Sequence, residues 1–477
     1  MIIRDKYSFS FYGLIAIYLL LSAVFIIGEK FQFTLIIPFA LIILLVMIRS
    51  YDMIFFLIAF LTPLSVNLGY FIQDLPVELS LFTEPLLILL LLIILIKFLR
   101  YHQININIFR QSINMSIMLF LMWTLISAFF STMPQVSFKF FISKLWLILP
   151  VFYIGISLFK DFGKILDFLL IHSLGVTIIV IYSTLQLVFD NILSKNAIHF
   201  AVQPFYNDHT AYGAILALLL PITTGMIFIY KKTVMKFIMT TISILFLLGI
   251  FLSYSRASWL GLILAMIILL IILLRIRFIY VLISSILLSM VLITFWFQII
   301  DRLEKNNQDS SANLSHHILS ITNISTDASN VERLNRWHCA IEMFREKPVF
   351  GWGPGTYQFQ YAPYQLERMR TIISTNTGDV GNAHSEYLGP LAEQGLPGIF
   401  FFLLMTISIL YTGFSIYNRS RKKEIRILAL SVSLGFLTYF LHGFLNNFLD
   451  TDKLAVPFFG LAAVLLSLKI YHSESNA

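Results

Sequence analysis

An arginine and a tryptophan four residues apart, Arg333 and Trp337, lie in a polar segment of this 477-residue chain. If the segment is helical, residues at this spacing share one face. A guanidinium group binds phosphate through paired hydrogen bonds, and an aromatic face covers a sugar ring, so the pair suits an anionic, sugar-bearing ligand. Alternatively, the tryptophan anchors the helix at a membrane surface and the arginine stacks on it. Arg336 and Tyr357 are further candidates for ligand binding.

Two other ionisable residues lie beside apolar segments. Arg256 lies in SYSRASWLG, where a charge is costly unless it serves a function or reaches the water interface along its flexible side chain. His384 lies in AHSEYLGPLAEQGLPG, where an imidazole can accept a proton near neutral pH or orient a hydroxyl. A hydrogen-bonded structural role is the alternative for this histidine. Ser255 and Ser385 adjoin these two residues and join the candidate site.

Two polar clusters complete the candidates. FYNDHTAYG supplies Asn207 with Asp208 and His209, although Asn207 or Asp208 can simply cap a following helix. Asp450 and Asp452 form an acidic pair that can bind a divalent cation, but a chance pairing in a polar loop is the preferred interpretation. Because the sequence has no HExxH, CxxC or phosphate-binding glycine motif, we expect neither a metal nor a cofactor.

The composition excludes a soluble globular domain. The chain is 58% hydrophobic and 12% charged, whereas an ordinary domain has about 25% charged residues. Its one cysteine excludes a disulfide scaffold. Apolar stretches long enough to span a bilayer recur and predict an all-α polytopic membrane protein with about 14 membrane-spanning helices, or as few as about 12. The expected spans are 9–27, 33–48, 53–72, 80–96, 113–131, 142–159, 165–189, 210–230, 237–253, 257–274, 278–299, 395–416, 427–445 and 454–470.

Lys and Arg are concentrated in alternate loops, which marks those loops as cytoplasmic. Both termini are therefore expected in the cytoplasm, and the formal net charge of +8 reflects topology rather than nucleic-acid binding. The same pattern divides the chain into an N-terminal membrane bundle (1–300), a large external loop with a re-entrant segment (301–394) and C-terminal membrane helices (395–477).

The external loop contains one predicted helix. Apolar residues recur at helical spacing over 331–347, and Ser329 followed by Glu332 has the pattern of a capping box. The helix should end before Pro348 and the glycine-rich turn 351–355.

The chain then re-enters the membrane after the histidine segment. Gly389-Pro390 should kink a short helix there, and Gly395 with the following Leu-Pro should end it.

Three motifs stand in a fixed order and together resemble the O-antigen ligase family, which also holds O-antigen polymerases and bacterial protein O-oligosaccharyltransferases. They are SYSRASWLG at 253–261, ERLNRWHCAIEMFREKPVFGWGPGTY at 332–357 and AHSEYLGPLAEQGLPG at 383–398. FYNDHTAYG is similar to an Asn-bearing stretch of the family. The resemblance covers about residues 200–450, and it departs from the family at Ser385, where Asn is commoner, and at Gly389-Pro390.

The resemblance implies a fold of the GT-C glycosyltransferase type and a glycan donor carried on undecaprenyl pyrophosphate. It implies that Arg256 and Arg333 stabilise the departing pyrophosphate and that His384 accepts the proton of the acceptor hydroxyl. Direct displacement without a metal would invert the anomeric carbon. The substrate-binding residues would be Asn207, Ser255, Arg336, Trp337, Tyr357 and Ser385.

The acceptor is open on sequence alone. Ligation to lipid A–core is favoured, with polysaccharide polymerisation and protein O-glycosylation as alternatives. A lipid-linked oligosaccharide flippase or an anion transporter is the competing class, but transporters commonly have two similar halves. Here the distinctive polar residues gather in one external loop and its flanks. We therefore expect an enzyme of the bacterial inner membrane that contacts membrane lipids, binds no nucleic acid and has its active site facing the periplasm.

Overall fold

The computed structural model describes residues 51–70, 80–101, 106–189, 200–277, 328–369 and 381–473, with single residues at 280, 287, 290 and 294. The chain divides into two compact units, residues 1–57 and 58–477. Only residues 51–57 of the first unit are described. The contacts discussed below belong to the second unit.

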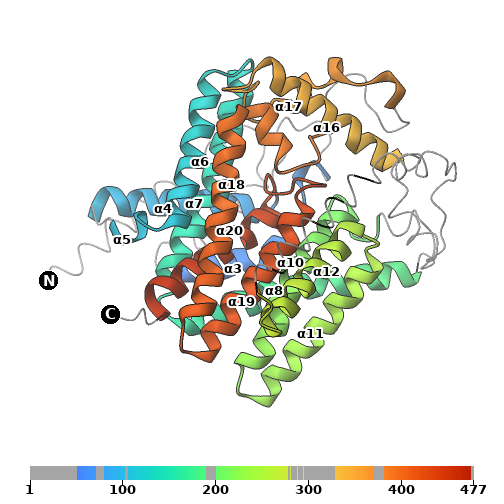
Figure 1. The fold of residues 1–477 in the computed structure, drawn as a ribbon. Helices are drawn as coiled ribbons and strands as arrows, with labels where there is room; N and C mark the ends of the chain where they lie inside the picture. Colours follow the sequence, from blue (N-terminus) through green and yellow to red (C-terminus); the bar gives the residue numbers. More distant parts are fainter. Residues whose placement is uncertain are drawn as a thin grey trace, which may run out of the picture. The chain divides into compact units, whose positions relative to one another are not determined.

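The described residues are helical apart from loops and one isolated bridge between Asn67 and Ser80. The all-α prediction is therefore confirmed for this part of the chain. The helices (Figure 1) are α3 (Tyr51–Leu64), α4 (Thr83–Tyr101), α5 (Ile106–Phe109), α6 (Ser112–Phe129), α7 (Pro134–Leu158), α8 (Phe162–Phe189), α10 (His209–Ile229), α11 (Thr233–Leu252), α12 (Arg256–Leu273), α16 (Ala328–Glu346), α17 (Tyr357–Gln360), α18 (Leu388–Arg419), α19 (Lys423–His442) and α20 (Asp452–Ser467).

Within the described residues, 9 helices are long and apolar enough to cross a membrane: α6, α7, α8, α10, α11, α12, α18, α19 and α20 with its continuation to His472. They indicate a multi-pass membrane protein. The predicted spans 9–27 and 33–48, and nearly all of 278–299, lie outside the described residues. Helix α3 and the apolar part of α4 are shorter than the others. A total of about 14 spans therefore remains a prediction from hydropathy.

Two predicted boundaries are wrong by several residues, and α3 ends at Leu64 rather than at 72. Helix α7 begins at Pro134, well before the predicted start at 142, so it includes Lys139 as well as Lys144. In the structure Lys144 is buried and its ammonium group lies 2.6 Å from the Asp450 carboxylate. A charge with such a partner can be accommodated inside a helix bundle.

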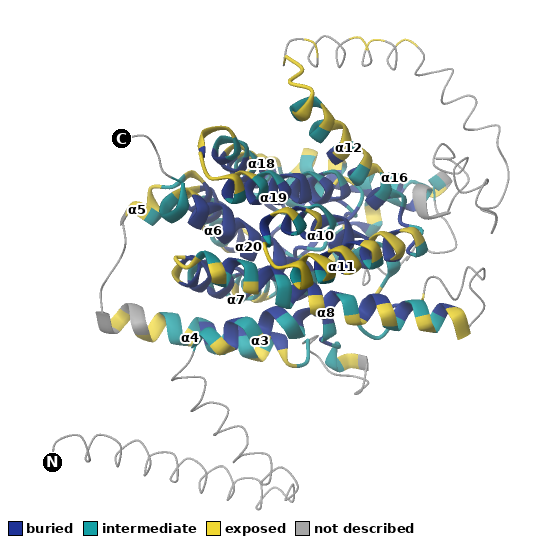
Figure 2. Cartoon of the chain, turned by 90° about the horizontal axis from the view of Figure 1, so that it is seen from below, coloured by how far each residue is buried: buried dark blue, intermediate teal, exposed yellow. Residues whose placement is uncertain are grey.

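Helix α10 packs against α8, α11, α12 and α19. Small residues allow the close approach: a Cβ atom added to Gly435 of α19 would lie 2.4 Å from the carbonyl oxygen of Leu218 on α10. Helices α19 and α20 are largely dark blue in Figure 2, whereas α11 carries exposed residues along one side. This packing brings the N-termini of α10 and α12 to the C-terminal end of α19.

Helix α16 packs against α18 and sits with α17 at one end of α6 and α18 (Figure 1). The prediction of a helix over 331–347 is confirmed, but α16 begins at Ala328, so Ser329 lies inside it rather than at its N-cap. Glu332 pairs with Arg336 instead of completing a capping box. A small core joins α16, the segment after it and the start of α18: Cys339, Ala340, Met343, Tyr357, Tyr361, Ala383 and Ala392.

Candidate functional site

His384 lies in a tight turn whose backbone is held on both sides. Its φ of 48° is in the left-handed region, which is unfavourable for a residue with a side chain. Its backbone N–H donates to Asn382 Oδ1 at 3.0 Å, and its carbonyl accepts from Trp337 Nε1 at 3.4 Å. Two residues later, the N–H of Glu386 donates to the carbonyl of Gly443 at 2.8 Å. Strained turns of this kind persist where the surroundings over-determine them, and they are frequent at functional sites.

Arg336 of α16 fixes the segment that precedes His384. The Arg336 side chain is buried, and its Nε donates to Glu332 Oε1 at 2.7 Å. Its Nη1 donates to the carbonyl of Asn382 at 3.1 Å, and the guanidinium lies 4.8 Å from the centre of the Tyr361 ring. Because these groups engage the guanidinium, the geometry favours a positioning role over the predicted contact with substrate.

The glycine-rich turn after α16 packs on the first turns of α18. The N–H of Gly353 donates to the carbonyl of Glu393 at 2.8 Å, and the Glu393 carboxylate accepts from the N–H groups of Gly355 and Tyr357, both at 2.9 Å. A Cβ atom at Gly351 would lie 2.2 Å from the carbonyl carbon of Glu393. This close approach of two backbones explains the glycine spacing.

Helix α18 is interrupted at Gly395, where φ is 69° and ψ is −165°. The predicted end of a short helix at Gly395 is therefore confirmed. The predicted kink at Gly389-Pro390 is wrong, because Pro390 lies in the first turn of α18, where a helix needs no backbone N–H donor.

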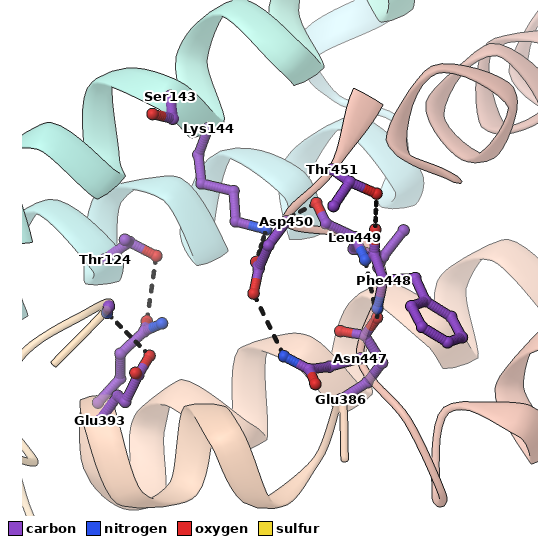
Figure 3. Close-up of polar contacts among 12 residues, drawn as sticks. Thr124, Ser143, Lys144, Glu386, Glu393, Asn447, Phe448, Leu449, Asp450 and Thr451 are labelled. Carbon is purple, nitrogen blue, oxygen red and sulfur yellow. Dashed lines mark hydrogen bonds and ion pairs between the residues drawn. The ribbon is translucent and has the colours of Figure 1, made fainter. Parts of the chain in front are cut away.

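Glu386 joins the His384 turn to the loop between α19 and α20 (Figure 3). Its buried Oε1 accepts from the N–H groups of Phe448 at 2.7 Å and Leu449 at 2.9 Å. It also accepts from the Tyr439 hydroxyl at 2.6 Å. Three donors on one carboxylate oxygen hold this segment to the membrane bundle.

Both members of the acidic pair have partners in the protein. Asp450 pairs with Lys144, whose Nζ also donates to the carbonyl of Leu449 at 2.9 Å (Figure 3). The Asp452 carboxylate accepts hydrogen bonds from Ser65 Oγ, Ser80 Oγ and Thr83 Oγ1. Across the described part of the chain, no group of three His, Cys, Asp or Glu side chains is arranged to hold a metal ion.

Arg256 is the first residue of α12, and Ser255 occupies its N-cap position. The Ser255 side chain makes no capping hydrogen bond and instead accepts from Ser258 Oγ at 2.9 Å. Tyr254, just before, has a φ of 49°, so a strained turn precedes Arg256 as one contains His384. The first N–H groups of α12 and the guanidinium together place positive charge at this helix end.

Asp208 caps α10, as the sequence allowed. Its Oδ1 accepts from the N–H groups of Thr210 at 2.7 Å and Ala211 at 2.8 Å. Asn207, beside it, is exposed. A Cβ atom added to Gly213, one turn further along α10, would lie 2.7 Å from Ser255 Cβ. The N-terminal turns of α10 and α12 are therefore in contact.

Three charges from two segments act on His384. Burial, and after it the positive charges of Arg336 and Arg333, lower the pKa of His384 to about 3, although the Asp208 carboxylate opposes them. The imidazole is therefore neutral at physiological pH and has a lone pair to accept a proton. The arrangement combines a proton acceptor with guanidinium groups, as transfer from an anionic leaving group requires.

In a comparison with protein-family models, residues 241–403 match the model described as O-antigen ligase. Over this stretch the chain is similar to the O-antigen ligase family. The resemblance seen in the motifs is thereby confirmed over this stretch, which contains Arg256, Arg333 and His384. The family transfers lipid-linked glycans, so the match indicates an enzyme of that general class. No curated protein matches the chain.

Inside this O-antigen ligase region, several predicted binding residues have partners in the protein. The Tyr357 hydroxyl donates to the carbonyl of Arg336 at 2.8 Å, and its ring stacks on Tyr361. Ser385 Oγ accepts from the N–H groups of Tyr387 and Leu388 at 3.3 Å. These contacts account for Tyr357 and Ser385 as supports of the His384 turn, and their contact with substrate stays a prediction.

Two residues of the site were missed by the sequence reasoning. Glu386 follows His384 by two positions, and its importance lies in donors more than 50 residues away in the chain. His442 ends α19 beyond the O-antigen ligase match, and the charges of Asp208 and Arg333 both reach it. An ionisable residue in an apolar helix was the available signal, because such residues are rarely placed without a task.

Proposed function

We propose that this protein transfers a glycan from an undecaprenyl-pyrophosphate donor to an acceptor hydroxyl at the periplasmic face of the bacterial inner membrane, with lipid A–core as the acceptor. The observation that carries the proposal is the position of His384, which is buried and within reach of the Arg333 and Arg336 charges that lower its pKa, inside the region that matches the O-antigen ligase model. A base and a cation so placed suit a reaction in which a hydroxyl loses its proton while a pyrophosphate departs.

In the proposed reaction the acceptor oxygen attacks the anomeric carbon of the donor. The bond from that carbon to the pyrophosphate oxygen breaks, and undecaprenyl pyrophosphate leaves with the electron pair. His384 takes the proton of the attacking hydroxyl. Since one nucleophile displaces one leaving group, the anomeric configuration inverts.

Negative charge that develops on the pyrophosphate needs cations or oriented dipoles. Arg256 and the first N–H groups of α12 supply them from the membrane helices, because helix N-termini bind phosphate groups. Arg333 supplies a second guanidinium from α16. A bound pyrophosphate also raises the pKa of His384, since its negative charge favours the imidazolium, and so strengthens the base when the donor is present.

The reaction is proposed to need no metal. The Asp450 carboxylate pairs with Lys144, and the Asp452 carboxylate accepts hydrogen bonds from three hydroxyl groups. Purified protein should keep full activity in excess EDTA. Loss of activity that Mg²⁺ restores would contradict this part of the proposal.

The charge distribution supports an external site. Asp208 begins α10, and Lys231 and Lys232 follow its other end. Lys423 begins α19, and His442 ends it near the site. The basic residues thus lie at the opposite ends of the two helices from the site, and basic loops face the cytoplasm.

The test is a gel of surface glycans from a deletion strain that is complemented with wild type or with arginine variants. Arg256→Ala and Arg333→Ala should abolish transfer while the protein still inserts into the membrane. Arg345→Ala is the matched control, because Arg345 lies on the same helix as Arg333 but is exposed and pairs with Glu342. Normal transfer by either Arg256→Ala or Arg333→Ala would remove that residue from the mechanism.

The same gel distinguishes the acceptors. Free lipid A–core with accumulated lipid-linked polymer would support ligation. Lipid A–core that bears a single repeat would instead assign the protein as a polymerase. An unchanged lipopolysaccharide ladder would contradict both and direct the search to glycoproteins or to another exported polymer.

A further inference from the structure

His442 is a buried histidine whose two ring nitrogens both have partners. It is the last residue of α19 and is almost fully shielded from solvent. Asn446 Nδ2 lies 3.1 Å from its Nε2, and Ser258 Oγ lies 3.5 Å from its Nδ1. One ring therefore links the end of α19 to the first turn of α12.

The order of donors along this link follows from the chemistry of its ends. An amide nitrogen can only donate, so Asn446 donates to His442 Nε2, and the ring proton is on Nδ1. His442 Nδ1 then donates to Ser258 Oγ, and Ser258 Oγ donates to Ser255 Oγ at 2.9 Å. The chain ends at the residue directly before Arg256.

Ser255 is part of this chain of hydrogen bonds and does not cap α12. Its oxygen accepts from Ser258 Oγ and makes no hydrogen bond to the first N–H groups of α12. Helix α10 packs against Ser258: a Cβ atom added to Gly213 of α10 would lie 2.6 Å from Ser258 Oγ. The direction of the Arg256 helix end is thus set by groups packed on both sides.

Gly443, the residue after His442, contacts the segment that carries His384. The carbonyl of Gly443 accepts from the N–H of Glu386 at 2.8 Å, two residues after His384. The end of α19 therefore contacts both the turn that carries His384 and the first turn of α12 that carries Arg256.

We propose that His442 is a positioning residue of the transfer reaction: through Ser258 and Ser255 it orients the N-terminus of α12, and hence Arg256, relative to His384. This proposal rests on the proposed function of Arg256 and His384. Its effect should fall on the transition state, because a cation displaced from the departing pyrophosphate stabilises the developing charge less.

The experiment measures kcat and KM for a lipid-linked glycan donor with the full-length protein in lipid vesicles. His442→Ala should lower kcat by about 10- to 100-fold, since a small misplacement of a reacting group has effects of this size. The KM for the donor should change by less than about threefold, because the Arg256 contact strengthens as the transition state forms. His442→Asn should restore most of kcat, because its amide nitrogen can replace the Nδ1 donor to Ser258.

Two further variants separate positioning from general destabilisation. His172→Ala removes another buried histidine, one that bonds to the carbonyl of Ala59 on a different pair of helices, and should leave kcat unchanged. Ser258→Ala breaks the same chain with a smaller change in volume, so it tests the proposal even if His442→Ala fails to fold. Combined with His442→Ala, it should add little further loss, since both act through one link.

A wild-type kcat in His442→Ala or Ser258→Ala would overturn the positioning role. So would a loss that His442→Asn does not restore. If either result is found while Arg256→Ala is inactive, the positioning role of His442 is excluded and the proposed function is not. Full activity of Arg256→Ala would instead remove Arg256 from the mechanism and with it the basis of the positioning role, while the transfer activity itself would stand.

Discussion

The indole nitrogen of Trp337 donates a hydrogen bond to the backbone carbonyl of His384, 3.4 Å away. The bond joins two residues that are 47 positions apart and that belong to different motifs. It fixes the carbonyl of a residue whose φ is 48°, so the tryptophan supports a strained turn besides any contact of its ring with a sugar.

Replacing Trp337 with Phe should separate these two roles, because Phe keeps an aromatic ring but has no donor. We expect Trp337→Phe to lower the transfer rate by several fold, since one neutral hydrogen bond contributes about 1 kcal/mol. Trp352→Phe is the matched control: it removes a similar bond, from Nε1 to the carbonyl of Met343 at 3.0 Å, away from His384. Equal rates for both variants in a transfer assay would show that the Trp337 bond has no catalytic importance.

The pH dependence of kcat/KM should report the pKa of His384 in the free enzyme. Burial and the charges of Arg336 and Arg333 lower this pKa, and Asp208 raises it. Activity that needs the neutral imidazole is lost as the pH falls through the pKa, so the acidic limb should lie below 6.5, the ordinary value.

Two variants should move that limb in opposite directions. Arg333→Gln removes a positive charge and should shift the limb of its residual activity to higher pH. Asp208→Asn removes a negative charge, keeps an oxygen to cap α10 and should shift the limb to lower pH. A limb that stays in place in both variants would exclude His384 as the group that titrates.

The break in α18 should depend on glycine at one position and not at another. At Gly395, φ is 69° and an added Cβ atom would lie 2.2 Å from the carbonyl oxygen of Val349. Gly395→Ala should therefore destabilise the protein by at least about 1 to 2 kcal/mol from the left-handed backbone alone. At Gly389 nothing lies within 4 Å, so Gly389→Ala should be neutral or stabilising by up to about 1 kcal/mol. Thermal unfolding in detergent measures both, and equal midpoints would contradict the assignment of the break.

Glu386 should be needed for stability and for transfer together. Glu386→Gln removes the charge from an oxygen that accepts three hydrogen bonds, each of which contributes about 1.5 to 3 kcal/mol when one partner is charged. We expect a lower unfolding midpoint and a slower reaction, because the His384 turn loses part of its anchor. Glu342→Gln, in a partly exposed ion pair with Arg345, should have little effect on either. A variant Glu386→Gln with wild-type stability would show that the anchor is not needed.

Features encoded locally were predictable from the sequence. Hydropathy predicted the helical class, and apolar periodicity predicted the helix α16. The polar pair before an apolar run predicted that Asn207 or Asp208 caps α10, and the cap is Asp208. The motifs around Arg256, Arg333 and His384 gave the family, since each consists of neighbouring residues with their own pattern.

Features made by distant contacts were not predictable. The ion pair of Lys144 could not be predicted, because its partner, Asp450, is about 300 residues away in the chain. Ser329 and Glu332 have the pattern of a capping box, but the Glu332 carboxylate pairs with Arg336, one turn further along α16. The link from His442 to Ser258 crosses 184 residues, and no periodicity encodes such a pair.

The most direct test of the account is transfer by purified protein in lipid vesicles that contain an undecaprenyl-pyrophosphate-linked glycan and an acceptor. We expect that wild type forms the glycosylated acceptor and releases undecaprenyl pyrophosphate. His384→Gly, which relieves the strain of the left-handed turn, should insert at least as well and form no product. Product formed by His384→Gly at the wild-type rate would contradict the assignment of His384 as the base.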